Sequence, residues 1–475
     1  MVDRSLRILQ VSPSDSIGGG HIIPWNLFRS YRARGHNSWL AVGSKRSDHR
    51  DVLVVPNHMR ATPWSRFFGA LGQKCERFES KVPGLRRVIR ACEHPWRGME
   101  SRLGIEDFNY PGTRQIVNLT PQKPDIVHFH NLHGGYFDLR ALPWLSQQVV
   151  TILTLHDAWL LSGHCAHSLD CERWKTGCGR CPYLSIYPAI RRDATHYNWR
   201  RKQRIYAGSR LYVATPSQWL MDKAAQSILA AGTVEARVIP NGVDLSVFHP
   251  ADKRWARVSL HLPEEAQIIL CAGFRMQTNI WKDYKTVRAA IGQAAERLQK
   301  QRVMLIALGE AGASERIGEM EIRCLPYQKD PAVVARYYQA ADLYVHAARA
   351  DTFPSSVLEA LACGTPVVAT AVGGIPEQVK GLKVSSSSDA RRDGNLYGMD
   401  KATGLLVPPA DVEEMARGIE RLLEADLLRR RMSENATKDA SERFDLQRQV
   451  DEYLQWYEEL VQRAGAARKI AAGIR

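Results

Sequence analysis

The stretch DTFPSSVLEALACGTPVVAT, residues 351–370, decides the fold class of this chain. A Phe-Pro turn precedes a helix-forming run around Glu359. Gly364 ends that run, because glycine readily adopts the left-handed conformation that follows a helix. Residues 367–370 are a short apolar run bounded by turn residues, which favours a buried strand. The segment therefore predicts a loop, a helix and a strand, the repeating unit of an α/β domain.

The same stretch carries groups that suit a nucleotide. Ser355 and Ser356 are expected to cap the helix, and the free amides of a helix N-terminus bind anions such as phosphate. Glu359 lies in the first turns of that helix, and Asp351 precedes it, so two carboxylates are available to sugar or ribose hydroxyls. A capped amphipathic helix of any α/β protein is the alternative interpretation.

The length and composition of the chain limit its number of domains, its location and its partners. The chain has 475 residues, 44% of them hydrophobic, which predicts two or three domains with an ample core. Its apolar runs fall short of the roughly 20 residues that cross a bilayer. The N-terminus reads as a first strand and not as a signal peptide, so we expect a cytoplasmic protein. The net charge of +15 favours nucleic acid, phospholipid or phosphate-bearing partners, or simply a solvated basic surface.

The N-terminal part opens like a Rossmann-like unit. An expected strand, residues 7–12, runs into a glycine-rich loop with Gly18 and Gly19, and an expected helix follows at 22–34. The glycine spacing differs from the dinucleotide fingerprint, so NAD is not predicted. Residues 57–115 then mix arginines with tryptophans and phenylalanines. This region is interpreted either as helices packed on the first domain or as a contact with a membrane surface or a lipid-linked acceptor.

Histidines gather at two expected strand ends. His130 ends a strand predicted at 124–130 and His133 lies in the loop after it, whereas His156 follows the next strand, at 149–155. The carboxyl ends of parallel strands form the ligand crevice of an open α/β sheet, so we expect these side chains at one edge. Each histidine by itself is also compatible with a purely structural role.

Four cysteines cluster in the loop 156–182. Reduced thiols are the rule in a cytosol, and four soft ligands in a short span suit a tetrahedral structural zinc ion. His164 and His167 are further nitrogen ligands, and four free thiols without metal are the alternative. The four candidate ligands are Cys165, Cys171, Cys178 and Cys181.

The C-terminal part repeats the α/β pattern. Strands are expected at 267–273, 303–309, 322–327 and 342–346, and a loop insertion is expected at 380–398. Arg275 and Lys282 follow the first of these strands, where they could both face phosphates.

The motifs closely resemble those of the family 4 retaining glycosyltransferases. Asp351 and Glu359 stand in the family's pair of acidic residues, with seven residues between them, before an Ala-x-Ala-x-Gly-x-Pro-Val-Val-like run. His156 with its following aspartate matches the family's Leu-His-Asp strand end, Ile-Pro-Asn-Gly-Val-Asp matches at 239–244, and Thr-Gly-Leu-Leu-Val-Pro matches at 403–408. The cysteine-rich loop is similar to that of a bacterial exopolysaccharide, or colanic-acid-type, subgroup.

The resemblance implies the GT-B architecture, in which two Rossmann-like α/β domains face a central cleft. It places the crossing between the domains at residues 240–250. We therefore expect an acceptor-side domain at 1–240, a nucleotide-sugar domain at 241–445, and a C-terminal helix at 446–475 that returns to the first domain.

The implied function is a retaining transfer of a sugar from a UDP- or GDP-sugar to a lipid-linked or oligosaccharide acceptor in surface polysaccharide synthesis. A peripheral contact with the inner membrane surface is possible, and neither a catalytic metal nor nucleic acid is expected. The resemblance also implies a role for each site residue. Lys282 and Arg275 would neutralise charge, and the diphosphate would contact Gly18, Gly19, Ser355 and Ser356. Tyr327 would contact the base, Glu359 the ribose, Asp351 would orient the donor sugar, and His156 would lie beside the reacting centre.

Two alternatives stay open. A sugar-nucleotide epimerase or a phosphorylase would share this fold. A basic zinc-bearing protein could instead bind nucleic acid, although the basic residues are dispersed and match no recognition module.

Overall fold

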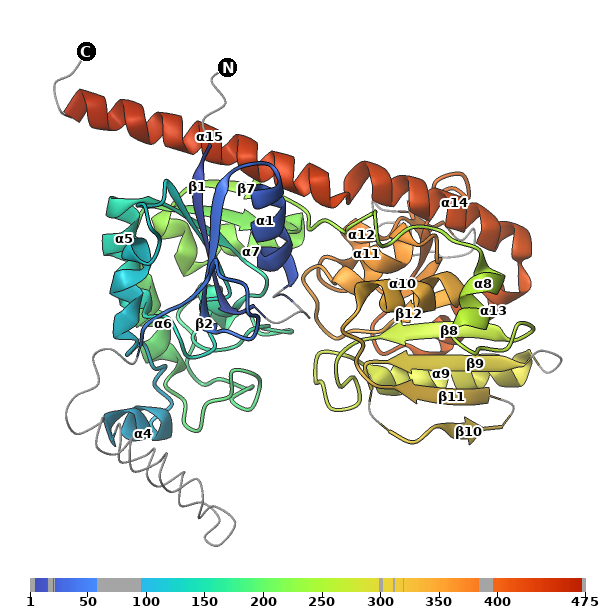
Figure 1. Ribbon diagram of the computed structural model, residues 1–475. Helices are drawn as coiled ribbons and strands as arrows, with labels where there is room; N and C mark the ends of the chain where they lie inside the picture. Colours follow the sequence, from blue (N-terminus) through green and yellow to red (C-terminus); the bar gives the residue numbers. More distant parts are fainter. Residues whose placement is uncertain are drawn as a thin grey trace, which may run out of the picture. The chain divides into compact units, whose positions relative to one another are not determined.

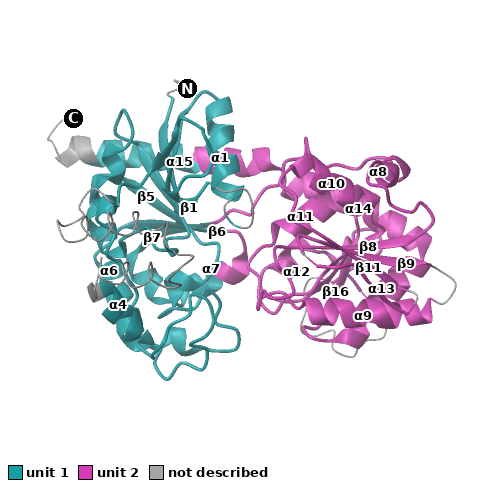
Figure 2. Ribbon diagram, turned by 60° about the horizontal axis from the view of Figure 1, so that its bottom comes forward, with its two compact units in different colours: residues 1–215, 221–237, 456–475 teal, residues 216–220, 238–455 magenta. Residues whose placement is uncertain are grey.

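The computed structural model forms two compact units, coloured separately in Figure 2. Unit 1 comprises residues 1–215, 221–237 and 456–475, and unit 2 comprises residues 216–220 and 238–455. The structure describes residues 5–15, 20, 22–57, 95–298, 302–310, 312–318, 320–383 and 396–471.

Unit 1 is built on a seven-stranded sheet with the order β3-β2-β1-β4-β5-β6-β7. β1 runs parallel to β2 and to β4, and β5 runs parallel to β4 and to β6. This is the doubly wound order of a Rossmann-like sheet, with its switch point between β1 and β4. The strands are β1 (Arg7–Ser14), β2 (Asn37–Ser44), β3 (Val52–Val54), β4 (Ile126–His130), β5 (Val150–Thr154), β6 (Leu211–Thr215) and β7 (Thr233–Val238).

Several helices of unit 1 bury apolar side chains in its core. In α1 the buried side chains recur at helical spacing, from Ile23 to Leu27, Phe28 and Tyr31. The helices are α1 (Ile22–Ala33), α4 (Pro95–Arg102), α5 (Leu142–Gln148), α6 (Thr195–Ala207) and the last part of α15 (Leu446–Ala471), while α7 (Gln218–Ala225) is divided between the units. The 3₁₀ turns are Pro111–Asn118, Leu139–Ala141, Trp159–Leu161, Arg173–Lys175 and Ile228–Gly232.

Unit 2 repeats the doubly wound order in a nine-stranded sheet, β10-β11-β9-β8-β12-β13-β16-β14-β15. β10 pairs antiparallel with β11, and the other recorded pairs are parallel. The switch point lies between β8 and β12. The strands are β8 (Gln267–Ala272), β9 (Val303–Leu308), β10 (Glu315–Ile317), β11 (Met320–Leu325), β12 (Leu343–His346), β13 (Val367–Thr370), β14 (Gly381–Leu382), β15 (Leu396–Tyr397) and β16 (Gly404–Val407).

Helices pack on both faces of this second sheet, as Figure 1 shows for α9 and α11. Alternate residues of β8 point to opposite faces: Ile268 and Leu270 join the core under α10 and α11, whereas Ile269 joins the core under α9 and α13. The helices are α8 (Lys253–Ser259), α9 (Tyr284–Arg297), α10 (Pro331–Ala340), α11 (Ser355–Ala362), α12 (Ile375–Gln378), α13 (Val412–Glu424), α14 (Asp426–Arg443) and the first part of α15.

These elements confirm the prediction of two α/β units with parallel sheets. The loop, helix and strand expected from residues 351–370 are the approach to α11, α11 itself and β13. Most of the region 57–115 lies outside the described residues, and so does most of the insertion expected at 380–398. Among the helices of the described ranges, none is both long and apolar enough to cross a membrane.

Candidate active site

A partly buried ion pair lies at the switch point of the unit 2 sheet. Lys282 Nζ donates to Asp351 Oδ2 over 2.6 Å and lies 3.2 Å from His346 Nε2. Burial opposes ionisation of Asp351, but the Lys282 ammonium and the nearby His346 ring outweigh it and hold the pKa of this carboxyl well below its usual range. Burial and the same ammonium lower the pKa of His346 to about 4. The three side chains therefore form an ammonium, a carboxylate and a neutral imidazole at neutral pH.

Backbone contacts hold this group in place. Lys282 forms an isolated β-bridge with Ala348, just past the end of β12, and His346 is the last residue of that strand. After β13, Gly373 adopts a left-handed φ of +59° and packs against the Asp351 backbone, where an added Cβ would lie 1.7 Å from the carbonyl oxygen of Asp351. Because two strand ends and a glycine turn meet here, the position of the carboxylate depends on the sheet itself.

Glu359, on α11, is the second carboxylate of this unit. The Tyr338 hydroxyl, from α10, donates to Glu359 Oε2 over 2.9 Å. Burial raises the pKa of Glu359 to about 7, and the Tyr338 hydrogen bond opposes that rise. A partly buried carboxylate with so high a pKa is a candidate to bind a ligand that brings hydroxyls to it.

The predicted cap of α11 is wrong in one respect. Pro354 is the N-cap residue, and its position carries no side-chain cap hydrogen bond. Ser355 and Ser356 are instead the first two helical residues, so their contribution at this end is their backbone amides. The helix begins four residues after Asp351, and its first backbone amides could bind an anion at this end. The structure is therefore compatible with an anion site there.

Arg275 and Tyr327 lie on exposed loops of the same unit. Arg275 has a left-handed φ of 51°, and its amide donates to the carbonyl of Gly309. Within the described residues, no recorded ion pair links its guanidinium to Asp351. Tyr327 is 39% exposed and meets Phe274, which is 64% exposed, in an edge-on contact with ring centroids 5.9 Å apart. These two rings form an exposed aromatic pair after β8 and β11.

The histidines of unit 1 do come together at one sheet edge. His130 Nδ1 and His156 Nε2 are 2.9 Å apart, and His130 Nε2 lies 2.6 Å from Gln10 Oε1. The glycine loop approaches the same place, because a Cβ on Gly20 would lie 3.7 Å from His156 Cβ. Gly18 and Gly19, the glycines assigned to the diphosphate, lie outside the described residues.

His133 takes a different partner. Its Nε2 lies 2.6 Å from Asp157 Oδ2. Burial opposes the charge on this imidazole, but the carboxylate outweighs it and raises the pKa of His133. Burial likewise opposes ionisation of Asp157, but the His133 ring outweighs it and lowers the pKa of Asp157 to about 2. The predicted group of three histidines thus divides into a His130–His156 pair and a His133–Asp157 ion pair.

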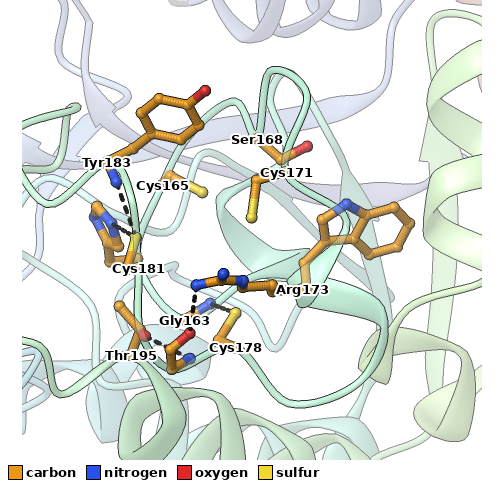
Figure 3. A pocket seen from close by; sticks show the side chains of 12 residues that line it. Gly163, Cys165, Ser168, Cys171, Arg173, Cys178, Cys181, Tyr183 and Thr195 are labelled. Atoms are coloured by element: carbon orange, nitrogen blue, oxygen red, sulfur yellow. Dashed lines mark hydrogen bonds between the residues drawn. The ribbon is translucent and has the colours of Figure 1, made fainter.

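The four clustered cysteines surround one small pocket, drawn in Figure 3. The amide of Gly163 donates to Cys178 Sγ over 3.3 Å, and the amide of Tyr183 donates to Cys181 Sγ over 3.4 Å. Burial raises the pKa of Cys178 to about 12. Among the side chains that the structure describes, however, no three His, Cys, Asp or Glu are placed so that they could hold a metal ion together. The zinc prediction is thus not supported by the side chains as they stand. The lining cysteines are Cys165, Cys171, Cys178 and Cys181.

Several site residues escaped the sequence interpretation. His346 ends a predicted strand, so the rule that found His156 could also have found it. Tyr338 and Gln10 carry no such signal, because their partners lie 21 and 120 residues away in the chain.

Two family models match the chain. The model described as Glycosyltransferase Family 4 matches residues 17–247, and the model described as Glycosyl transferases group 1 matches residues 254–439. Together they cover most of both units.

Curated relatives resemble parts of the chain. A putative colanic acid biosynthesis glycosyl transferase, WcaC of Escherichia coli K12, is 28% identical over 258 residues, 52% of this chain and 60% of the relative. A D-inositol 3-phosphate glycosyltransferase of Mycobacterium tuberculosis H37Ra is 30% identical over 339 residues, 67% of this chain and 60% of the relative. That of Segniliparus rotundus is 33% identical over 203 residues, 40% of this chain and 43% of the relative. The chain therefore spans 43 to 60% of the length of these relatives.

Solved structures share the fold. The Anabaena protein Alr3699/HepE, solved in complex with UDP and glucose, has a TM-score of 0.59 at 17% identity, with 96% of this chain and 100% of that one covered. A sucrose-phosphate synthase of Thermosynechococcus elongatus has a TM-score of 0.57 at 19% identity, with coverages of 96% and 99%. These similarities confirm the predicted GT-B type of fold.

Proposed function

Because this chain belongs to the family 4 type of glycosyltransferases, with the GT-B fold, we propose that it transfers a sugar from a nucleotide diphosphate sugar to an acceptor hydroxyl. The observation that carries the proposal is the group at the switch point of unit 2. It combines the Lys282 ammonium paired with Asp351 over 2.6 Å, the amide end of α11, and the partly buried Glu359 on the same helix. A diphosphate needs a cation and free amides, and a ribose needs a carboxylate.

In the proposed reaction, Lys282 leaves Asp351 for the diphosphate when the donor binds. Asp351 is then available to a hydroxyl of the donor sugar, and Glu359 accepts hydrogen bonds from the ribose. The bond between the anomeric carbon and the phosphate oxygen breaks with its electron pair going to the phosphate. A bond forms from the acceptor oxygen to the same carbon, and the acceptor's proton goes to the departing phosphate. Lys282 and the α11 amides stabilise the charge that develops there.

We assign retention of the anomeric configuration and a UDP- or GDP-linked donor on two grounds. The acidic pair around α11 resembles that of retaining family members, and the similar Anabaena protein was solved with UDP. The exposed Phe274 and Tyr327 rings offer a face for the base. Arg275, exposed on the neighbouring loop, is proposed as a second cation for the diphosphate.

A screen of nucleotide sugars tests this proposal directly. Donor hydrolysis and transfer are followed by NMR, which also gives the configuration of the product. The expected result is turnover of a UDP- or GDP-sugar with retention. Interconversion of the free nucleotide sugar would instead indicate an epimerase, and consumption of inorganic phosphate a phosphorylase.

The acceptor is proposed to be a lipid-linked oligosaccharide of a surface polysaccharide. The name of the similar Escherichia coli protein, which refers to colanic acid biosynthesis, supports this class. Extraction of transferred label into organic solvent distinguishes a lipid-linked acceptor from a free oligosaccharide.

A structural zinc ion in the cysteine pocket is part of the same proposal. Its supports are the four thiols around one pocket and the backbone amides that donate to Cys178 and Cys181. Because burial disfavours the Cys178 thiolate, a cation would be needed to stabilise it there, and the thiols would have to turn toward a common centre.

Elemental analysis of the purified protein tests the zinc. We expect about one zinc ion per chain, since four thiolates complete a tetrahedral site. Cys178→Ser should lose the metal, whereas Cys324→Ser, at a thiol of unit 2 outside this pocket, should keep it. Metal-free protein with four reactive thiols in this loop contradicts the zinc and leaves the transferase proposal untouched.

A further inference from the structure

A buried imidazole shares the Lys282 ammonium with Asp351. Lys282 Nζ lies 3.2 Å from His346 Nε2 and 2.6 Å from Asp351 Oδ2. His346 Nε2 lies 3.6 Å from the same carboxylate oxygen, which is too far for a hydrogen bond. The ammonium therefore links the imidazole to the carboxylate. All three residues belong to unit 2.

The hydrogen bonds around His346 have one direction. An ammonium only donates, so His346 Nε2 accepts from Lys282 and carries no hydrogen. The ring is neutral above its pKa of about 4, so its hydrogen lies on Nδ1. Nδ1 lies 3.1 Å from the Tyr344 hydroxyl oxygen and donates to it, and that hydroxyl donates to the carbonyl of Ala272 over 3.4 Å. A carbonyl oxygen only accepts, so donors and acceptors match from Lys282 to Ala272.

The end of β12 holds these groups together. Tyr344 and His346 are two residues apart on that strand, and alternate residues of a strand point to the same face. Just past the strand, Ala348 forms the β-bridge that holds the backbone of Lys282. The backbone and the ammonium of Lys282 are therefore both attached to the same strand end.

The ammonium retains capacity for a ligand. Lys282 and His346 line one small pocket, together with Ala272 and Met276. An ammonium has three hydrogens, and the contacts recorded for Lys282 among the described side chains use two of them. A ligand can therefore be added to Lys282 without loss of the hydrogen bond to the imidazole.

We infer that His346 is a positioning residue, whose Nε2 keeps one hydrogen bond to the Lys282 ammonium while the bond to Asp351 is exchanged for one to a diphosphate. A neutral imidazole suits this role because it accepts from the ammonium without competing for it as a second anion would. The inference rests on the proposed function for the identity of the ligand, whereas the hydrogen on Nδ1 is a property of the protein alone.

Imidazole nitrogen NMR on protein labelled with ¹⁵N-histidine tests the attachment without a ligand. The His346 signals are identified by their loss in His346→Gln. At pH 7 the hydrogen should lie on Nδ1, with none on Nε2, and addition of UDP or GDP should leave it there. A hydrogen on Nε2 in either state overturns the inference, because Lys282 could not then donate to that nitrogen.

Three substitutions separate positioning from support of the fold, with UDP and GDP affinity measured by calorimetry on folded protein. His346→Leu removes the acceptor and should weaken binding about 10-fold or more, the usual effect of losing a hydrogen bond to a charged group. His346→Gln offers an amide oxygen near the place of Nε2 and should recover most of the affinity. Tyr344→Phe is the matched control, because it removes a buried partner of His346 and leaves the bond to Lys282. Equal losses in His346→Leu and Tyr344→Phe overturn the positioning role.

A double-mutant cycle tests whether His346 acts through Lys282. In the Lys282→Met background, the further change His346→Leu should lower nucleotide affinity no more, because the ammonium that it positions is already gone. An equal loss in both backgrounds would show that His346 acts on the ligand or on the fold directly, and it would overturn the inference.

Failure of this inference and failure of the proposed function give different results. If the parent binds neither UDP nor GDP and turns over no nucleotide sugar, while His346 carries its hydrogen on Nδ1, the proposed function fails and the attachment of Lys282 to His346 stands. If nucleotide sugars are turned over and folded His346→Leu binds the nucleotide as tightly as the parent, the positioning role fails and the function stands.

Discussion

At the scale of single residues, Glu359 combines a proposed binding role with a cost to stability. Its pKa of about 7 in the folded protein exceeds the roughly 4.3 of an unfolded glutamate. The folded state therefore binds more protons between these values, and stability should fall as the pH rises from about 4.3 to 7. Above pH 7 the full penalty is present, on the order of 3 kcal/mol.

Glu359→Gln should remove that penalty and weaken the donor. Urea unfolding at pH 8 should show a more stable protein, and the stability difference between variant and parent should shrink as the pH approaches 4.5. Donor binding should weaken by about 1.5–3 kcal/mol, the usual worth of a hydrogen bond to a charged group. A variant that binds UDP-sugars as tightly as the parent would contradict the ribose contact.

Lys282 and Asp351 are the second example at this scale, because each side chain neutralises the charge of the other when no ligand is bound. Their side chains are only 20% and 18% exposed. Lys282→Met should therefore leave an unpaired carboxylate and destabilise the fold by about 1–3 kcal/mol, with turnover lowered about 100-fold or more. The double variant Lys282→Met/Asp351→Asn should recover most of the stability and none of the turnover.

A matched control for this pair is Lys438→Met on α14. Lys438 makes an exposed helical ion pair with Glu442, at 77% and 59% exposure, and its loss should be far less costly. Equal destabilisation by Lys282→Met and Lys438→Met in chemical unfolding would show that the buried pair has no special role.

At the scale of elements, the turn after β13 positions the carboxylate. Gly373→Ala would place a methyl group 1.7 Å from the Asp351 carbonyl oxygen at a left-handed φ, so the Asp351 loop must move. We expect a folded but less stable protein whose donor turnover is largely lost. Turnover at the parent level would mean that the loop position is unimportant.

Gly292→Ala, inside α9, is the control for that substitution. A Cβ at Gly292 meets nothing within 4 Å, and alanine is a better helix former than glycine by about 0.5–1 kcal/mol. This variant should be as active as the parent and slightly more stable, as judged by thermal unfolding.

The elements also show what a sequence can reveal. The strand β13 has the predicted residues, because short apolar runs between turn signals identify buried strands well. Asp351, Glu359 and His156 could be proposed as site residues because each stands at a strand end or in a helix of a known motif. Tyr457 could not be found, because its partner Gln10 lies 447 residues away and only the folded unit brings them together.

At the scale of the whole molecule, α15 contributes to both units. Its residues through Gln455 belong to unit 2, and from Trp456 onward they belong to unit 1. Trp456, Tyr457 and Leu460 are fully buried there, and the Tyr457 hydroxyl lies 2.6 Å from His128 Nδ1. The last part of α15 is thus part of the core of unit 1.

The net charge of +15 is a property of the whole chain, and it predicts an affinity for anionic surfaces. A lipid-linked acceptor would be presented on such a surface. We expect the protein to sediment with vesicles that contain phosphatidylglycerol but not with vesicles of phosphatidylcholine alone. Binding should weaken with added salt, because surface attraction is screened beyond about 10 Å at 0.1 M ionic strength.

Charge reversal can locate this attraction. Arg86, Arg87 and Arg90 belong to the basic region 57–115, and their replacement by glutamate should abolish sedimentation with anionic vesicles. Reversal of three exposed arginines of unit 2, Arg254, Arg417 and Arg431, changes the net charge equally and is the control. Equal loss in both variants would show that net charge alone is responsible. Unchanged vesicle binding in both variants would exclude an electrostatic attachment. Both variants should still hydrolyse a soluble donor, because none of the six arginines is among the residues assigned to the donor.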